Sequence, residues 1–290
     1  MARLILSLPP PRLLTLDAYG TIYTPLGSVA EQYSSLYHQH YPDRPGDQAT
    51  TTNILAATFS QAFAARTKSH PNYSGGERQW WITVIKQTFD LAELPISSDF
   101  ATVLYNWFNS ANAYSVYQDI ADFLDSIPQS TKIGVLSNSD TRSRSVLSGL
   151  GMQKWIKDIV SDVVLSSEVG IEKPSPDIFG AASRKLLSLS PSAGNSFSPG
   201  MAFSPIEQAR QLQFWHVGDD FHKDIAPLIS EPSLSSWGGI YICPRLPGGI
   251  VSRKHDSIVT LGHNGRVLQT CDLRNLTTLF SPTGIQIEIN

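Results

Sequence analysis

The chain has 290 residues, of which 41% are hydrophobic and 16% charged, and its formal net charge at pH 7 is −3. This length is enough for one large domain or two modest ones with a substantial buried core, and the composition excludes a wholly disordered chain. The small negative charge gives no electrostatic reason to expect binding to nucleic acid or to an acidic membrane.

Two features bear on the compartment. Cys243 and Cys271 are too few for a disulfide framework, so we expect structural thiols in a reducing environment. No apolar run approaches the ~18 residues of a membrane-spanning helix. The apolar stretch 4–8 is broken at once by three prolines, which predicts a frayed lead-in to the first strand and not a signal peptide. We therefore expect a cytoplasmic protein.

The first predicted strand, residues 13–16, is a short apolar run that ends at an acid and a turn. Residues 28–115, which follow, have helical spacing of apolar residues and few strand signals. We expect a compact insertion of about four helices there. The predicted helices are residues 29–40, 53–67, 77–89 and 100–109.

From residue 117 onward, predicted strands and helices alternate. This alternation predicts a parallel sheet with helices on both faces. The predicted strands are residues 132–136, 163–165, 214–217 and 240–243, and the predicted helices are residues 119–127, 141–150 and 176–187.

The remaining segments carry weaker signals. Residues 188–205 are rich in Ser, Pro and Gly, and together with the shorter segment 230–236 they are predicted to be surface loops. The tail, residues 251–290, contains short apolar runs at 258–261 and 276–280. These runs either add strands to the sheet or pack outside it.

Polar side chains gather at the ends of the predicted strands or just beyond them. Open parallel sheets place their active sites outside the carboxyl ends of their strands, so we expect these groups to meet. The four segments are Asp17-Ala18-Tyr19-Gly20-Thr21, Ser137-Asn138, Glu172-Lys173-Pro174, and Gly218-Asp219-Asp220 with Asp224.

These residue types form a coherent chemical set. A carboxylate such as Asp17 can attack a phosphoryl or alkyl group and form a covalent intermediate. A hydroxyl such as Ser137 can hold an oxyanion, and Lys173 can neutralise charge between nucleophile and substrate. The metal would shield the attacking carboxylate from an anionic substrate. The acids suited to bind Mg²⁺ are Asp17, Asp219, Asp220 and Asp224.

The ordered set resembles the four motifs of the haloacid dehalogenase (HAD) superfamily. Asp17 and Ser137 begin the first two motifs 120 residues apart (137 − 17), and the helical insertion between them resembles the family's C1 cap. The resemblance covers about residues 12–245. It implies an α/β fold with a Rossmann-like parallel sheet, whose core is residues 1–27 and 116–290 and whose helical cap, inserted after the first strand, is residues 28–115.

Two short phrases narrow the resemblance. Tyr73-Ser74-Gly75 and Gln79-Trp80-Trp81 resemble a eukaryotic, particularly fungal, branch of HAD-like hydrolases. We expect adjacent tryptophans in a helix bundle to be split, with one buried and one partly exposed.

The resemblance also implies a role for each site residue. Asp17 would be the catalytic nucleophile, and Ser137 and Lys173 would hold the transferring group. Asp219 would be the most direct acidic metal ligand. The remaining roles are metal contact through the Tyr19 backbone carbonyl, support of the metal by Asp220 and Asp224, and substrate contact by Tyr19, Thr21 and Asn138.

One position departs from the phosphatases of this family. They carry a second Asp two residues after the nucleophile as general acid and base, whereas this chain has Tyr19, a phenol with a reference pKa of ~10. The string Asp-Ala-Tyr-Gly-Thr resembles the first motif of 2-haloacid dehalogenases. Those enzymes lack the metal acids, which this chain keeps as Asp219 and Asp220, and they use an early cap Arg that residues 28–40 do not contain.

Three functions remain open. The first is Mg²⁺-dependent hydrolysis of a small phosphorylated metabolite through an aspartyl-phosphate on Asp17. The second is a metal-independent 2-haloacid dehalogenase, and the third is a catalytically silent scaffold that binds a metabolite or a protein. Two local alternatives also stay open: Tyr19 either packs under the cap or contacts substrate, and His222 is either a loop residue or a surrogate acid.

Overall fold

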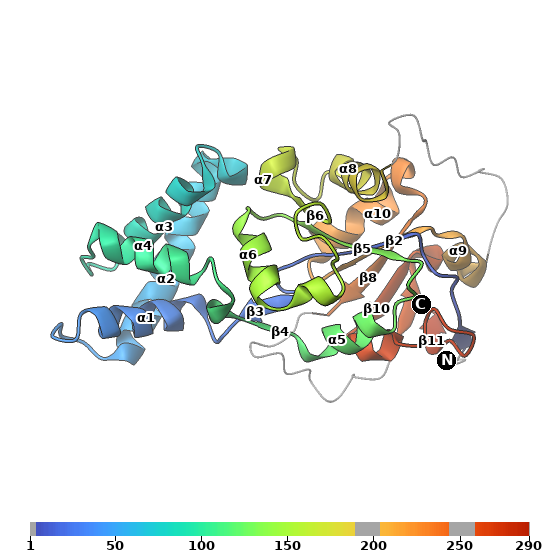
Figure 1. Ribbon diagram of the computed structural model, residues 1–290, viewed down its shortest axis with the longest axis horizontal. Helices are drawn as coiled ribbons and strands as arrows, with labels where there is room; N and C mark the ends of the chain where they lie inside the picture. The colour runs from blue at the N-terminus through green and yellow to red at the C-terminus, as the bar shows by residue number, and fades with distance from the viewer. Residues whose placement is uncertain (1–3, 189–203, 244–258, 290) are drawn as a thin grey trace.

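The computed structural model describes residues 4–188, 204–243 and 259–289. Its centre is a nine-stranded sheet in the order β1-β11-β9-β10-β8-β7-β2-β5-β6 (Figure 1). The six neighbouring strands from β10 to β6 are all parallel, which confirms the predicted α/β fold. These are β10 (Val267–Thr270), β8 (Trp237–Ile242), β7 (Phe214–Gly218), β2 (Leu13–Leu16), β5 (Lys132–Ser137) and β6 (Val163–Leu165).

The central strands are buried on both faces because helices cover both. In β2, Leu14 and Leu16 pack into one core cluster with α5 and α6, whereas Leu13 packs into another with α8 and α10. This explains why the parallel strands read as continuous apolar runs in the sequence. The covering helices are α5 (Gln118–Asp125), α6 (Arg142–Gly149), α7 (Ser166–Val169), α8 (Pro176–Leu187), α9 (Pro205–Gln211) and α10 (Ala226–Ser230).

The N-terminal stretch and the tail differ from the frayed or undecided segments expected from the sequence. β1 (Leu4–Leu6) pairs antiparallel with β11 (Ile285–Ile289), and β11 pairs parallel with β9 (Thr260–Gly262). β9 in turn pairs antiparallel with β10. The prediction of a frayed lead-in was therefore wrong, because its partner strand lies about 280 residues away and no local pattern could reveal it.

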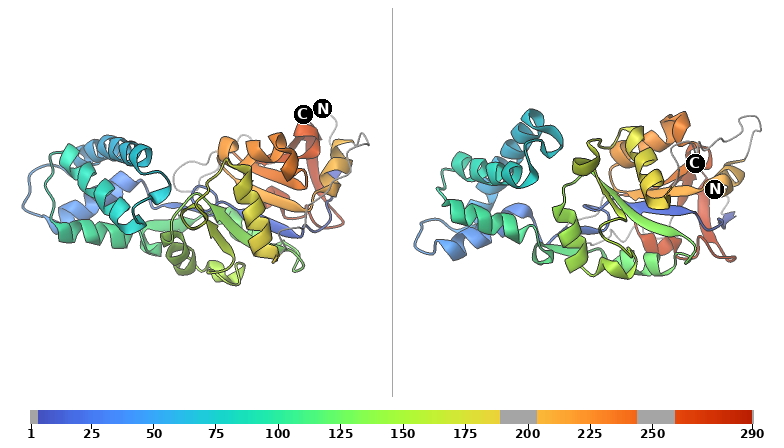
Figure 2. Two further views of the ribbon diagram at one scale, coloured as in Figure 1. Left: turned by 90° about the horizontal axis from the view of Figure 1, so that it is seen from above. Right: turned by 45° about the horizontal axis from the view of Figure 1, so that its top comes forward.

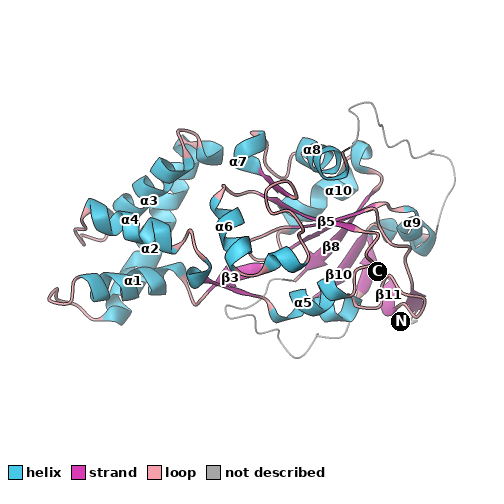
Figure 3. Ribbon diagram, viewed as in Figure 1, coloured by secondary structure: helices cyan, strands magenta, loops and turns pink. Residues whose placement is uncertain are grey.

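Four helices stand to one side of the sheet in all views (Figures 1 and 2). The chain enters and leaves them through β3 (Tyr23–Pro25) and β4 (Tyr114–Val116), which pair antiparallel. Figure 3 shows this segment as almost entirely helical. The helices are α1 (Val29–His40), α2 (Gln48–Ser69), α3 (Glu77–Leu91) and α4 (Ser98–Trp107).

Local capping sets where these helices begin. Ser28 and Glu31 form a reciprocal capping box at α1, Asp47 accepts a hydrogen bond from the Thr50 N–H at α2, and Ser97 caps α4. α2 starts five residues earlier than expected because its first turn is polar and follows the Asp47 cap. The helices share an aromatic core that includes Tyr33, Tyr37, Phe89 and Phe100.

Several short turns of helix complete the fold. Gly151 has a φ of +77° just after α6, as expected of a residue that ends a helix. The short segment Pro232–Leu234 lies inside the predicted loop 230–236, and most of the predicted loop 188–205 lies outside the described residues. The remaining short helices are Pro71–Tyr73, Ala111–Ala113, Met152–Lys154, the π-helix Phe221–Ile225, His263–Gly265 and Leu273–Leu276.

Over the described ranges of the chain, the structure contains no helix of sufficient length and apolarity to cross a membrane.

Candidate active site

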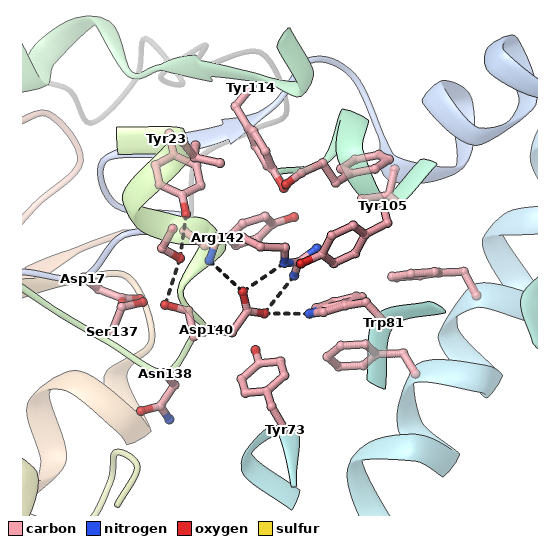
Figure 4. A pocket seen from close by; sticks show the side chains of 18 of the residues that line it. Asp17, Tyr23, Tyr73, Trp81, Tyr105, Tyr114, Ser137, Asn138, Asp140 and Arg142 are labelled. Carbon is pink, nitrogen blue, oxygen red and sulfur yellow. Dashed lines mark hydrogen bonds and ion pairs between the residues drawn. The ribbon is translucent and has the colours of Figure 1, made fainter. Parts of the chain in front are cut away.

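The four polar segments singled out in the sequence meet at the carboxyl edge of the sheet. Asp17 follows β2, Ser137 ends β5 and Asp219 follows β7, and these three strands are direct neighbours. Lys173 reaches the same point from the loop between α7 and α8. All four of these residues line one cavity, part of which is drawn in Figure 4.

A buried lysine holds two carboxylates at the centre of this edge. The Lys173 Nζ lies 3.0 Å from Asp17 Oδ1 and 2.6 Å from Asp224 Oδ1. It also donates to the Leu136 carbonyl oxygen at 3.1 Å. Burial opposes the charge on Lys173, but Asp17 and Asp224 outweigh it and raise the lysine pKa, so the ammonium stays charged beside Asp17.

Asp224 is fully buried, and its second partner is a histidine on β7. The His216 Nε2 lies 3.2 Å from Asp224 Oδ1, and its Nδ1 lies 2.8 Å from the Thr15 hydroxyl. Burial lowers the pKa of His216, so the ring is neutral and its Nε2–H donates to Asp224 while Nδ1 accepts from Thr15. Burial alone would raise the pKa of Asp224, but Lys173 and this hydrogen bond lower it. Sequence reasoning missed His216, although a histidine inside an apolar strand was a visible signal.

Asp219 completes a group of three acids. Carboxylate oxygens of Asp17, Asp219 and Asp224 lie within 4.8 Å of one another. Asp219 accepts from the Thr21 hydroxyl at 3.2 Å, so Thr21 supports this acid, and its contact with substrate stays a prediction. Burial, with added repulsion from Asp17 and Asp224, raises the pKa of Asp219 to about 6.

This group of oxygens fits a hard divalent cation. Mg²⁺ prefers carboxylate oxygens, and a cation between them removes the repulsion that raises the Asp219 pKa. Only one buried ammonium, Lys173, faces the three acids in the described structure. Asp17 and Asp219 would hold such a cation most directly, because Asp224 already accepts from Lys173, His216 and the Asp220 N–H.

Two glycines make this close approach possible. A Cβ on Gly20, whose φ is +85°, would lie 2.3 Å from Asp219 Oδ2. A Cβ on Gly218 would lie 2.2 Å from Asp224 Oδ2. Side chains at either position would therefore push the acids apart.

Asp220 lies outside the group of three acids. Its carboxylate pairs with the Lys223 ammonium at 2.9 Å and caps the following turn by accepting from the Lys223 N–H. Lys223 lowers the pKa of Asp220, despite the opposing effect of partial burial. A metal role for Asp220 stays a prediction, and the geometry gives it less support than it gives Asp219.

Asn138 binds the backbone of the lysine loop. Its Nδ2 donates to the Lys173 carbonyl oxygen and its Oδ1 accepts from the Lys173 N–H, both at 2.7 Å. This pair of bonds fixes the segment that delivers the Lys173 ammonium. Ser137 is buried and lines the cavity near Asp17 (Figure 4), in keeping with its predicted role.

Tyr19 stands at the cavity wall with 53% of its surface exposed. Its ring meets Tyr23 edge to face at a centroid distance of 6.3 Å. The surrounding protein raises the pKa of the Tyr19 phenol, mainly by burial and then through Tyr117 and Asp219. Tyr19 is thus a neutral phenol that lines the cavity and also packs against Tyr23. Packing under the cap and contact with a substrate are therefore not mutually exclusive for this residue.

The cavity extends from the three acids into the helical segment and has a volume of about 480 Å³. This is within the usual range for small-molecule sites. Burial raises the pKa of Tyr114 to about 12 and also raises that of Tyr105, so these phenols are neutral hydrogen-bond donors. The aromatic wall of the cavity includes Tyr33, Phe59, Tyr73, Trp81, Tyr105 and Tyr114.

The cavity is also lined by an ion pair, Asp140 with Arg142, that was not predicted from the sequence. Asp140 accepts from Arg142 Nε and Nη2, both at 2.9 Å, and from the Trp81 indole N–H at 2.6 Å (Figure 4). The Arg142 guanidinium also lies 4.1 Å from the Trp81 ring centroid. Asp140 follows Ser137-Asn138 by two residues, so its place after a strand was a usable signal. Trp81 in α3 was not predictable as its partner.

The tryptophans of α3 behave as expected. Trp80 is 2% exposed and packs between helices, whereas Trp81 is partly exposed and lines the cavity. His222 is exposed and is not among the residues that line it.

Comparison with known proteins places this geometry in a family. A family model described as haloacid dehalogenase-like hydrolase matches residues 11–229. An uncharacterized hydrolase of Schizosaccharomyces pombe is 30% identical over 220 residues, which span 74% of this chain and 85% of that protein. A yeast relative agrees with the fungal resemblance of the cap phrases.

Solved structures show the same fold. A defluorinating L-2-haloacid dehalogenase superposes with a TM-score of 0.60 at 12% identity, covering 96% of this chain and 99% of that one. The HAD-hydrolase YfnB from Bacillus subtilis, crystallised bound to magnesium, gives a TM-score of 0.55 at 12% identity, covering 93% and 99%. At this identity the two structures establish the architecture alone.

Proposed function

This chain belongs to the haloacid dehalogenase-like hydrolases, and we propose that it hydrolyses a small phosphorylated metabolite in a Mg²⁺-dependent reaction through a phosphoryl group on Asp17. One observation carries the proposal: oxygens of Asp17, Asp219 and Asp224 lie within 4.8 Å of one another beside the Lys173 ammonium. Such a group can receive a dianionic substrate only if further positive charge is added.

Each residue has a defined task in this reaction. A carboxylate oxygen of Asp17 attacks phosphorus, and Lys173 holds the attacking carboxylate at 3.0 Å and faces the incoming phosphoryl oxygens. Ser137 is placed to donate its hydroxyl to one of those oxygens. Mg²⁺ held by Asp17 and Asp219, with the Tyr19 carbonyl as a further ligand, would supply the charge that lets an anion approach a carboxylate.

The second step is hydrolysis of the aspartyl-phosphate by water. The family's usual general base is replaced by Tyr19, and the Asp140 carboxylate is engaged by Arg142 and Trp81. We therefore expect this step to be slow compared with the first.

The dehalogenase alternative has less support from the site. The similarity of this chain to a dehalogenase structure concerns the fold alone. A reaction without metal would also leave Asp219, whose pKa is raised, without a function. If the protein were a catalytically silent scaffold, the buried Lys173–Asp224 pair would have no function, since such pairs rarely add stability.

Two further assignments accompany the proposal. We infer that residues 28–115 act as a cap over a core formed by residues 1–27 and 116–290, because the aromatic wall of the cavity comes from α1–α4 and the segments that follow α2 and α4. A cytoplasmic location remains a prediction from the cysteine content.

The test is turnover of p-nitrophenyl phosphate with Mg²⁺, with EDTA, and by the Asp17→Asn variant. We expect turnover that requires both Mg²⁺ and Asp17, while Asp43→Asn, which alters an exposed acid, behaves like the parent protein. Chloride release from 2-chloropropionate in EDTA would establish the dehalogenase instead. Absence of both activities, with no covalent modification of Asp17, would leave the scaffold.

A further inference from the structure

The part of the cavity beyond the reacting phosphoryl group is aromatic. Tyr33 comes from α1, Phe59 from α2, Trp81 from α3 and Tyr105 from α4, and all four line the space above Asp17. Flat rings in such a wall favour a flat ring in the ligand, through edge-to-face and stacked contacts. Figure 4 shows Tyr73, Trp81, Tyr105 and Tyr114 converging on this space from different sides.

Among the described residues, no cationic side chain of the cavity is without a carboxylate partner. Three cations line the described cavity, and each already has a carboxylate partner. Arg142 pairs with Asp140, Lys223 pairs with Asp220 at 2.9 Å, and Lys173 pairs with Asp17 and Asp224. A carboxylate or ammonium on the ligand would have to displace one of these ion pairs. The group attached to the phosphate is therefore uncharged.

Among the described residues, the cavity also lacks a free general acid with a pKa near neutrality, because the phenols of Tyr19, Tyr105 and Tyr114 have pKa values raised mainly by burial. No histidine lines it within the described residues, and every carboxyl that does is engaged. Asp140 is held by Arg142 and Trp81, Asp220 by Lys223, and Asp219 belongs to the group of three acids. An alcohol that leaves as an alkoxide needs a proton, because its pKa is near that of water, ~16. A phenol, with a pKa of ~10, leaves far more readily without one.

Ring recognition, absence of charge and absence of an acid point to one class of substrate. We propose that the substrate is a phosphate monoester of an uncharged phenol, an aryl phosphate, whose ring packs against the aromatic wall of the cavity that includes Trp81 and Tyr105. This inference rests on the proposed function and specifies its leaving group.

The reaction then needs only water as co-reactant. An Asp17 oxygen forms a bond to phosphorus while the bond from phosphorus to the aryl oxygen breaks. The aryl oxygen leaves with the electron pair as a phenolate and takes a proton from water. A second water molecule attacks the aspartyl-phosphate, which restores Asp17 and releases inorganic phosphate and a proton.

The experiment compares three esters in Mg²⁺: 2-naphthyl phosphate, 2-naphthylmethyl phosphate and cyclohexylmethyl phosphate. The first two share a ring but differ in leaving group, and the last two share a leaving group but differ in ring. We expect kcat/KM for the naphthyl ester to exceed that for the naphthylmethyl ester by about 100-fold, the lower range of what a missing general acid costs. We expect the naphthylmethyl ester to have a lower KM than the cyclohexylmethyl ester.

Variants separate the two parts of the inference. Trp81→Leu and Tyr105→Leu should each raise KM for the naphthyl ester several-fold, whereas Val103→Ala, an exposed change on α4 outside the cavity, should not. Tyr19→Asp, which introduces a carboxyl at the cavity wall, should raise kcat/KM for the naphthylmethyl ester more than for the naphthyl ester. Circular dichroism would verify that each variant is folded.

The outcomes are distinguishable. If the naphthyl and naphthylmethyl esters are hydrolysed at rates within about threefold, with dependence on Mg²⁺ and Asp17, the proposed function stands and the aryl substrate is refuted. Equal KM values for the naphthylmethyl and cyclohexylmethyl esters would refute ring recognition. If no ester is hydrolysed and the acid-quenched protein carries no phosphoryl group on Asp17, the proposed function itself fails and the inference falls with it.

Discussion

The Lys173 ammonium and the Asp224 carboxylate lie 2.6 Å apart, and both side chains are buried beneath the carboxyl edge of the sheet. The same ammonium reaches Asp17 at 3.0 Å, so one cation joins Asp17 to the segment after β7. The ionised state of Asp224 is therefore supported by a lysine delivered by a different loop.

Removal of that cation should destabilise the fold as well as abolish activity. Lys173→Met leaves the Asp224 carboxylate buried without a counter-charge, and breaking such pairs costs about 3–5 kcal/mol. Urea unfolding would measure this loss. Lys154→Met is the matched control, since its pair with Asp125 is exposed on both sides and should contribute little to the free energy of unfolding. Similar losses in both variants would contradict the buried-pair argument, and Asp224→Asn should partly rescue Lys173→Met.

Gly20 should be required for Asp219 to reach its place. In Gly20→Ala the new Cβ would meet Asp219 Oδ2 at 2.3 Å and the backbone would keep an unfavourable φ of +85°. Gly151→Ala is the control, because its φ of +77° imposes similar strain while no atom lies within 4 Å of its Cβ. Both variants should lose about 1 kcal/mol of stability, but only Gly20→Ala should weaken Mg²⁺ binding in calorimetry. Equal Mg²⁺ affinities in the two variants would show that Asp219 moves without cost.

Mg²⁺ binding should weaken in acid. The pKa of Asp219 in the metal-free protein is raised to about 6, first by burial and then by Asp17 and Asp224. Above pH 6 this carboxylate is ionised and ready to bind, whereas below pH 6 a proton competes with the metal. The Kd for Mg²⁺ should therefore rise about tenfold for each pH unit below 6.

Two substitutions assign that titration. Asp219→Asn should weaken Mg²⁺ binding at every pH and remove the dependence near pH 6. Asp220→Asn should keep both the affinity and the dependence, because Asp220 pairs with Lys223 outside the group of three acids. A loss of affinity in Asp220→Asn as large as in Asp219→Asn would make Asp220 a ligand.

His216 should give the fold a separate dependence on pH. Burial lowers its pKa in the folded state below the unfolded value of 6.5. The unfolded chain therefore binds a proton more readily, so the stability is full above about pH 6.5 and decreases as the pH falls below it, by at most about 1.4 kcal/mol per pH unit. Urea unfolding at pH 7.5 and 5.5 would measure this.

The variant for this test is His216→Gln, made together with Asp219→Asn because Asp219 titrates in the same range with the opposite sign. This double variant should show a smaller change in the free energy of unfolding between pH 7.5 and pH 5.5 than the Asp219→Asn variant alone. His222→Gln, which alters an exposed histidine, should leave the slope unchanged. A slope that persists in His216→Gln would mean that another group causes it.

Much of the architecture could be predicted because it is encoded locally. The strands 163–165 and 13–16 are apolar runs bounded by turns, and α1 and α8 have clear helical spacing, with a capping box at the start of α1 and a proline at the start of α8. The edge strand β1 and its neighbour β11 were not predictable, because each is short and pairs with the other from the opposite end of the chain. The early start of α2 was missed because its first turn is polar.

The candidate site could likewise be predicted from the sequence only in part. Asp17, Ser137 and Asp219 could be placed together from sequence because each follows a strand of a parallel sheet, and such strands end at one edge. The relative roles of Asp220 and Asp224 could not be separated, since the two acids are only four residues apart. Three-dimensional packing directs Asp224 inward to Lys173 and His216 and leaves Asp220 at the surface with Lys223.

By itself, the sequence determined the family, the order of the motifs and the chemistry available at the strand ends, because these depend on residue types and short-range patterns. Only the tertiary structure decided what surrounds that chemistry. The pairing of Trp81 with Asp140 joins residues 59 positions apart, and the aromatic wall above Asp17 is assembled from four separate helices. Side chains on different elements meet through packing of the whole chain, and no local pattern records which of them will share a cavity.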